Sequence, residues 1–123
     1  MQGPILIVED HKIVLNSLRE WLQLVLPKYR IIEATSGEEA VDLVGTEKPR
    51  LIIMSLNLPG MNGIEATRQI KRISPSTSVI IMTLHEDSIY KAYAQAAGAS
   101  AIIPKLSTPS LLRPTLFTLL STT

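Results

Sequence analysis

The sequence has 123 residues, close to the common size of one domain, and 46% of these residues are hydrophobic. Charged residues make up 19% and the formal net charge is +1, which argues against nucleic-acid binding through bulk charge. Without a cysteine, the chain has no disulfide, thiolate zinc site or cysteine nucleophile. We expect one domain over residues 1–123.

The start of the chain shows no export signal. Met1-Gln2-Gly3-Pro4 leads directly into a short apolar run, without the basic start and long apolar stretch of a signal peptide. No apolar stretch approaches the roughly 20 residues that cross a bilayer. We therefore expect a cytoplasmic protein that does not contact a membrane.

Five short apolar runs predict five strands. Continuous runs of this length are typical of strands that are buried on both faces. Pro104 lies at the end of the last run, and a proline at this place favours the edge of a sheet. The predicted strands cover residues 4–8, 30–34, 51–54, 79–82 and 101–103.

A helical pattern follows each strand. The first helix should bury Val14, Leu18, Trp21, Leu22 and Val25 on one face and stop at Pro27. Ser36 is the expected N-cap of the second helix, which should end near Gly45. Gly98 should follow the end of the fourth helix. The third, fourth and fifth helices are predicted at about 64–73, 87–97 and 109–120.

The alternation of strands and helices predicts a doubly wound α/β domain. In such a domain the carboxyl ends of the parallel strands face one crevice, where ligands bind. We expect this crevice to hold the polar residues that end the strands or follow them. These residues are Glu9, Asp10, Ser55, Thr83 and Lys105.

The residue types in this predicted crevice suit phosphoryl chemistry. The adjacent carboxylates of Glu9 and Asp10 are suited to a hard divalent cation such as Mg²⁺, and the backbone carbonyl of Asn57 can add an oxygen ligand. Thr83 offers a hydroxyl donor and Lys105 a compact positive charge to an anionic oxygen. The pattern places a metal on one side and an anion-binding pair on the other.

These residues and their spacing carry a family resemblance. The sequence resembles the response-regulator receiver domain over essentially its whole length. The matching segments are 5–11, 51–63, 79–83 and 96–99, together with Lys105. Asp10-His11 and Lys105-Leu106-Ser107 are most similar to the subfamily that usually carries a helix-turn-helix output domain, and we expect no direct nucleic-acid contact from the present segment.

The resemblance implies a flavodoxin-like (βα)5 three-layer sandwich with five parallel strands in the order 2-1-3-4-5. It also implies a non-enzymatic signalling module whose partner is a histidine kinase or another signalling protein. By position, Glu9 and Asp10 correspond to the acidic pair that binds Mg²⁺, and Asn57 corresponds to the residue whose carbonyl is a further ligand. Thr83 corresponds to the switch hydroxyl, and Lys105 corresponds to the lysine that pairs with the phosphate. Ser55 stands at the place of the phosphate-accepting aspartate, and Ile102 at the place of the switch aromatic residue.

The serine alters the expected chemistry. A carboxylate is nucleophilic at neutral pH without help, whereas a serine hydroxyl needs an adjacent base, and the sequence offers no convincing one near Ser55. Serine also removes a negative charge that would attract Mg²⁺ and Lys105. We expect weakened Mg²⁺ binding and lost or severely reduced phosphoacceptance, so that the domain would act as a pseudo-receiver through protein contacts.

Other interpretations stay open from the sequence. Ser55 can be native or an engineered replacement in a conventional phosphorelay receiver, and codon 55 of the native gene separates the two. A flavodoxin-like cofactor-binding protein is disfavoured, because acidic Glu9-Asp10 replaces a phosphate-binding glycine loop. His11 and His85 are expected to face solvent. Exposed apolar residues among Leu111, Leu116 and Phe117 would mark a homodimer surface on the last helix.

Overall fold

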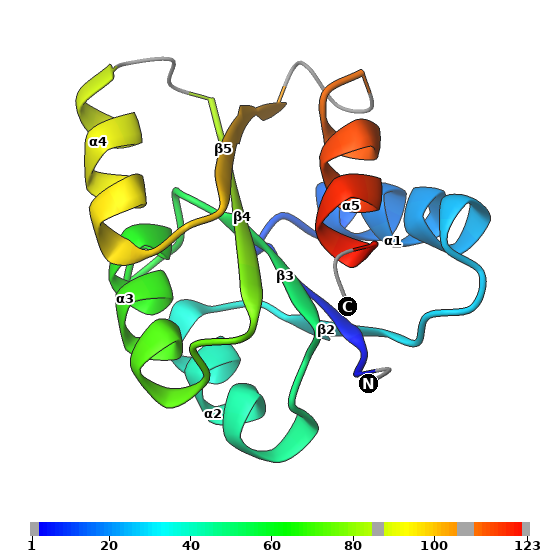
Figure 1. Ribbon diagram of the computed structural model, residues 1–123, viewed down its shortest axis with the longest axis horizontal. Helices are drawn as coiled ribbons and strands as arrows, with labels where there is room; N and C mark the ends of the chain where they lie inside the picture. The colour runs from blue at the N-terminus through cyan, green and yellow to red at the C-terminus, as the bar shows by residue number, and fades with distance from the viewer. Residues whose placement is uncertain (1–2, 85–87, 106–109, 122–123) are drawn as a thin grey trace.

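The computed structural model describes residues 3–84, 88–105 and 110–121, and it places one parallel sheet between two layers of helices (Figure 1). The strands are β1 (Ile5–Val8), β2 (Ile31–Ala34), β3 (Leu51–Ser55), β4 (Ser78–Thr83) and β5 (Ala101–Pro104). Their order in the sheet is β2-β1-β3-β4-β5, and every neighbouring pair is parallel. The predicted fold class and strand order are confirmed, and β5 with Pro104 is indeed an edge strand.

The helices cover both faces of the sheet. They are α1 (Lys12–Val25), α2 (Gly37–Glu47), α3 (Gly63–Ile73), α4 (Ser88–Ala97) and α5 (Leu112–Leu120). In Figure 1, α1 and α5 lie to the right of the sheet, whereas α2, α3 and α4 lie to its left and below. Within the described residues, none of these helices is both long and apolar enough to cross a membrane.

Alternate residues of each strand enter two separate hydrophobic clusters. In β3, Ile52 and Met54 pack with α2, α3 and α4, whereas Leu51 and Ile53 pack with α1 and α5. This arrangement explains why the strand sequences are continuous apolar runs, since side chains on both faces of the sheet are buried away from water.

Some helix ends and faces differ from the predictions. Val14 is 41% exposed, and Leu15 is buried in its place, because the buried face of α1 runs through Leu15 and Leu22. The second helix, predicted to end near Gly45, extends slightly further to Glu47. The next residue, Lys48, takes a left-handed conformation with φ 49° and donates its backbone N–H to the Val44 carbonyl. At the fifth helix, residues 110–111 form a turn before α5 begins at Leu112.

Two predicted capping residues are confirmed. The Ser36 hydroxyl accepts a hydrogen bond from the Glu39 backbone N–H at 3.1 Å. Gly98 follows α4 with φ 104°, a conformation that favours glycine. Local capping chemistry therefore sets these two boundaries as the sequence indicates.

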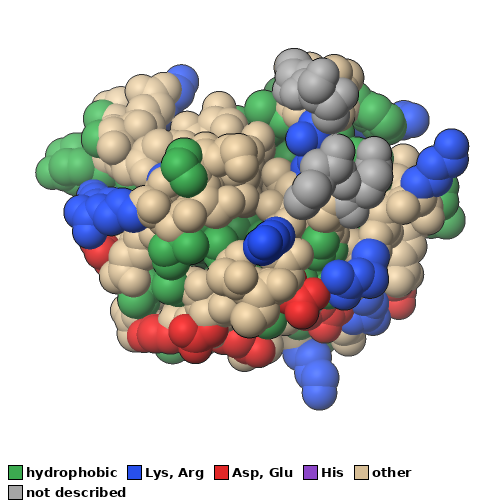
Figure 2. Space-filling view, turned by 60° about the horizontal axis from the view of Figure 1, so that its bottom comes forward, with side chains coloured by type: hydrophobic (Ala, Val, Ile, Leu, Met, Phe, Trp, Pro, Cys, Tyr) green, Lys and Arg blue, Asp and Glu red, His purple; other side chains and the backbone are tan. Residues whose placement is uncertain are grey.

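The face at the bottom of Figure 1, where the strands begin, carries no continuous basic patch among the side chains visible there. Figure 2 shows lysine and arginine side chains spread separately over this face, with acidic side chains gathered along its lower margin. This distribution agrees with the scattered basic residues of the sequence. The crevice at the carboxyl ends of the strands lies at the opposite edge.

Candidate functional site

Residues from three strand ends meet at the upper edge of the sheet in Figure 1. Ser55 is the last residue of β3, the central strand, and it is only 2% exposed. Glu9 directly follows β1 and Lys105 directly follows β5. Glu9 is only 3% exposed although it carries a charge, so the crevice must supply a partner for its carboxylate.

Lys105 provides that partner. Its ammonium nitrogen Nζ lies 2.9 Å from Oε1 of Glu9 and 2.9 Å from Oγ of Ser55. The side chain of Lys105 is 17% exposed, and that of Glu9 is 4% exposed. The structure thus brings together three of the predicted site residues in one partly closed ion-pair network.

Ser55 continues this network toward the loop after β3. Its hydroxyl donates a long hydrogen bond of 3.4 Å to the backbone carbonyl of Asn57. The next residue, Leu56, donates its backbone N–H to the Met82 carbonyl of the neighbouring strand at 2.9 Å. The Ser55 hydroxyl therefore accepts from Lys105 and donates to Asn57, so both of its hydrogen-bonding functions are used.

Gly63 holds the far end of the same loop against Ser55. Its backbone N–H donates to the Leu56 carbonyl at 2.9 Å. A Cβ atom at position 63 would lie only 2.2 Å from the backbone carbonyl oxygen of Ser55. The close approach of these two backbones requires glycine, a constraint that cannot be deduced from the turn-rich sequence alone.

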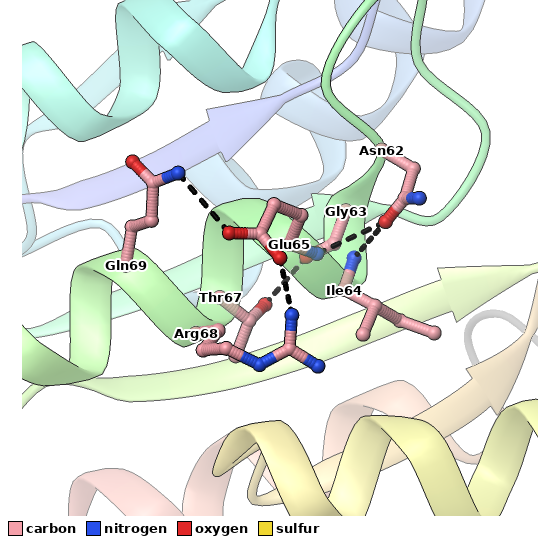
Figure 3. A network of polar contacts seen from close by, with 7 residues as sticks. All are labelled: Asn62, Gly63, Ile64, Glu65, Thr67, Arg68 and Gln69. Carbon is pink, nitrogen blue, oxygen red and sulfur yellow. Dashed lines mark hydrogen bonds and ion pairs between the residues drawn. The ribbon is translucent and has the colours of Figure 1, made fainter.

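Side-chain contacts at the start of α3 fix the position of Gly63 (Figure 3). Oδ1 of Asn62 accepts hydrogen bonds from the backbone N–H groups of Ile64 and Glu65, both at 2.9 Å. The Thr67 hydroxyl donates to the Gly63 carbonyl at 2.7 Å. These bonds satisfy backbone groups in the first turn of α3.

The carboxylate of Glu65 adds a surface cluster to this turn (Figure 3). It contacts the guanidinium of Arg68 and the side-chain amide of Gln69. The hydrogen bond from Gln69, followed by the positive charge of Arg68, lowers the pKa of Glu65 below its usual value. A carboxylate in the first turn also favours the helix through its dipole.

The end of β1 presents a second group of polar side chains. Oε2 of Glu9 accepts a hydrogen bond from the backbone N–H of His11 at 3.1 Å. Asp10 and His11 are exposed, as expected for His11, and one donor atom from each of Glu9, Asp10 and His11 lies within 4.8 Å of the others. Glu9 and Asp10 of this cluster are two of the residues at which the sequence predicts a cation, whereas His11 is not among them.

The residues present do not fit a tightly bound Mg²⁺ ion in this arrangement. Mg²⁺ prefers oxygen ligands in near-octahedral geometry. Both carboxylate oxygens of Glu9 already accept hydrogen bonds, one of them from an ammonium group. At position 55 a carboxylate would add negative charge for a cation, but Ser55 offers only a neutral hydroxyl. This hydroxyl donates a hydrogen bond to the Asn57 carbonyl, which is the predicted backbone ligand.

The geometry also bears on nucleophilic chemistry at Ser55. A serine next to a lysine can act as a nucleophile when the lysine removes the hydroxyl proton. Here the Ser55 hydroxyl accepts a hydrogen bond from Lys105, which is paired with the Glu9 carboxylate, and donates its own proton to the Asn57 carbonyl and not to Lys105. The serine hydroxyl is not activated by this contact.

A groove of about 450 Å³ opens beside the ion pair. Much of its wall is apolar and comes from α1 and from the end of β4, including the exposed side chains of Ile13 and Leu84. The lining residues are Glu9, His11, Ile13, Val14, Ser17, Leu18, Met82, Leu84 and Lys105. The groove makes Lys105 accessible from outside the domain.

The other predicted site residues lie around this network. Asn57 and Asp10 are exposed at its rim. Thr83 is buried at the end of β4, paired in register with Pro104 of β5. Ile102 is partly buried against the cluster formed with α2, α3 and α4. His85, Leu106 and Ser107 lie outside the described residues.

Comparisons with known proteins agree with this fold. The family model of the response regulator receiver domain matches residues 5–116. The response regulator UvrY of Escherichia coli K12 is 31% identical over 85% of this chain and 48% of its own length. A cyclic di-GMP phosphodiesterase of Thermotoga maritima is 36% identical over 89% of this chain but only 28% of its own length.

A solved structure gives the same picture for the three-dimensional fold. A two-component response regulator of the LuxR family from Aurantimonas sp. SI85-9A1 is 34% identical, with a TM-score of 0.90 over 98% of this chain and 86% of that one. The present chain spans about half or less of the length of the curated relatives it matches, for example 43% of DegU of Brevibacillus brevis. The matched relatives thus share this domain within longer proteins.

Proposed function

The chain belongs to the response regulator receiver domain family, and from this premise we propose that it is an atypical receiver impaired in phosphoacceptance. The observation that carries the proposal is the side chain at the end of β3. Ser55 presents a buried hydroxyl that is hydrogen-bonded to an ammonium group and lacks an activating base. Such a group does not replace the self-activated carboxylate of a phosphate-accepting aspartate.

The remaining site residues take their proposed roles from the family pattern. Glu9, Asp10 and the Asn57 carbonyl form the side of the crevice where the family binds Mg²⁺, with affinity weakened by Ser55. Lys105 is the phosphate-pairing lysine and Thr83 the switch hydroxyl. The contacts of Lys105 with Glu9 and Ser55 support its place at the centre of the crevice.

The proposed partners are proteins. A histidine kinase or another signalling protein meets the domain in the cytoplasm, and the domain signals through contacts on its surface. Two relatives are named as transcriptional proteins, DegU and ExaE, which supports a role in transcription regulation when the receiver is linked to a suitable output domain. We propose no enzymatic activity and no direct nucleic-acid contact for this domain.

A second copy of the chain is the proposed partner at the β5 edge. Exposed apolar side chains flank this edge strand on both layers: Tyr93 of α4 is 54% exposed and Phe117 of α5 is 44% exposed. Leu111 is also exposed, whereas Leu116 is fully buried and contributes to the core. Exposed apolar side chains favour association with a partner that covers them.

Phe117→Glu is expected to convert a dimer into a monomer, because it replaces an exposed apolar ring with a charged group. Light scattering coupled to gel filtration measures the change in mass. Leu24→Glu is the matched control: it changes an 81% exposed leucine on α1 and should leave the mass unchanged. A wild-type chain that stays monomeric at its highest soluble concentration would contradict the proposed homodimer.

The loss of phosphoacceptance is tested directly on the wild-type domain. Incubation with a small phosphodonor and Mg²⁺ is expected to give no acid-labile phosphoprotein, because position 55 has no carboxylate to form an acyl phosphate. Intact-mass spectrometry and an acid-stability assay measure the outcome. Stoichiometric formation of an acyl phosphate would overturn the proposed function.

A further inference from the structure

The crevice holds one buried carboxylate beside one partly buried ammonium group. The Glu9 carboxylate is buried, and an isolated buried carboxylate is strongly disfavoured unless a positive charge and hydrogen bonds compensate it. Lys105 supplies the positive charge at 2.9 Å and the His11 backbone N–H supplies a hydrogen bond at 3.1 Å. The carboxylate is thus neutralised by groups of the protein itself.

The serine makes this pairing possible. Ser55 offers Lys105 only a neutral oxygen. Within the described residues, Glu9 is therefore the only carboxylate that forms an ion pair with this lysine. A carboxylate at position 55 would compete with Glu9 for the ammonium group. Without that competitor, the Lys105 ammonium pairs with Glu9, the residue that the family pattern assigns to Mg²⁺ binding.

We propose that the Lys105 ammonium is the resident counter-cation of Glu9 and keeps divalent cations out of the crevice. A divalent ion bound to Glu9 would lie a few ångströms from the ammonium nitrogen, and two positive charges at such a distance repel each other strongly in a partly buried site. The inference rests on the proposed function for the identity of the crevice. It goes further by making the lysine, and not only the missing aspartate, the cause of weak Mg²⁺ binding.

Lys105→Met tests this role because methionine keeps the length of the side chain and removes its charge. Isothermal titration calorimetry with Mg²⁺ alone should show an affinity about tenfold higher or more for Lys105→Met than for the wild type. Thermal melts should show a Mg²⁺-dependent rise in Tm for the variant and none for the wild type. Lys28→Met, which removes the same charge from an exposed loop, should behave as the wild type.

Two further variants keep the test decisive. Lys105→Gln retains a hydrogen-bond donor for Glu9 without the charge, and it replaces Lys105→Met if that variant does not fold. Glu9→Gln combined with either change should abolish the gain in Mg²⁺ affinity. The inference is overturned if a folded, uncharged variant at position 105 binds Mg²⁺ no more tightly than the wild type.

Failure of this inference is distinguishable from failure of the proposed function. Unchanged Mg²⁺ affinity in the Lys105 variants, with no acyl phosphate on the wild type, would remove only the role of Lys105. An acyl phosphate on the wild type would instead overturn the proposed function, whatever the Mg²⁺ affinities are.

Discussion

Ser55→Asp is expected to convert the domain into one that binds Mg²⁺ and accepts a phosphoryl group. The new carboxylate would lie beside Lys105, because Oγ of Ser55 is already 2.9 Å from Nζ. Lys105 could then pair with the aspartate, which would leave Glu9 available to a cation. The change therefore restores a nucleophile and releases a metal ligand in one step.

The expected gain in Mg²⁺ affinity is about 10- to 100-fold. A unit charge about 4 Å from another contributes up to about 4 kcal/mol at an effective dielectric of about 20, and hydration offsets much of this energy. Calorimetric titration with Mg²⁺ measures the affinity. Incubation with a small phosphodonor should change the product from no acid-labile phosphoprotein to a readily detected one.

Ser55→Asn is the matched control for this prediction. Asparagine has nearly the shape of aspartate but no charge and no nucleophilic oxygen, so it should gain neither Mg²⁺ affinity nor phosphorylation. The aspartate variant should also be less stable without Mg²⁺ than with it, because its crevice holds more negative charge. An Asp variant that folds but binds Mg²⁺ no better than the Asn variant would show that the acidic residues are not arranged as described.

Gly63→Ala is expected to destabilise the domain by about 1–3 kcal/mol, the usual cost of forcing an extra methyl group into a packed site. Its Cβ would lie 2.2 Å from the Ser55 carbonyl oxygen and 3.0 Å from the Leu56 Cα atom. Both contacts are with backbone, so no side chain can rotate away. The strand end and the start of α3 would have to separate, and urea denaturation measures the cost.

Gly45→Ala is the control that the same chain offers. Gly45 lies inside α2, and a Cβ at this position meets no atom within 4 Å. Alanine should therefore stabilise the domain by about 0.5–1 kcal/mol, the usual difference between the two residues inside a helix. If Gly63→Ala were as stabilising as Gly45→Ala, the close approach at Ser55 would not exist in solution.

The sequence predicts the fold well because its signals are local or periodic. The continuous apolar runs identify the strands, and Ser36 and Gly98 mark helix boundaries through capping chemistry that involves only near neighbours. The first helix shows the limit of this approach. Its apolar residues leave several possible faces, and only packing against the sheet selects Leu15 over Val14.

The composition of the crevice is also predictable, whereas its pairing is not. Strand ends place Glu9, Ser55 and Lys105 at one edge, as the alternation of elements requires. That Lys105 contacts Glu9 depends on side-chain distances across a separation of 96 residues, and no sequence pattern encodes this choice. The requirement for glycine at position 63 arises in the same way, from the approach of two backbones.

The two hydrophobic clusters described above make the sheet a partition between two groups of helices. The hydrogen-bonded backbone of the sheet separates the side chains packed beside α1 and α5 from those packed beside α2, α3 and α4. The network of Glu9, Ser55 and Lys105 stands at the rim of that partition, where the strands end. A rearrangement at this rim would lie next to helices of both groups, because the groove beside Lys105 is lined by α1 and the Ser55 backbone lies against Gly63 of α3.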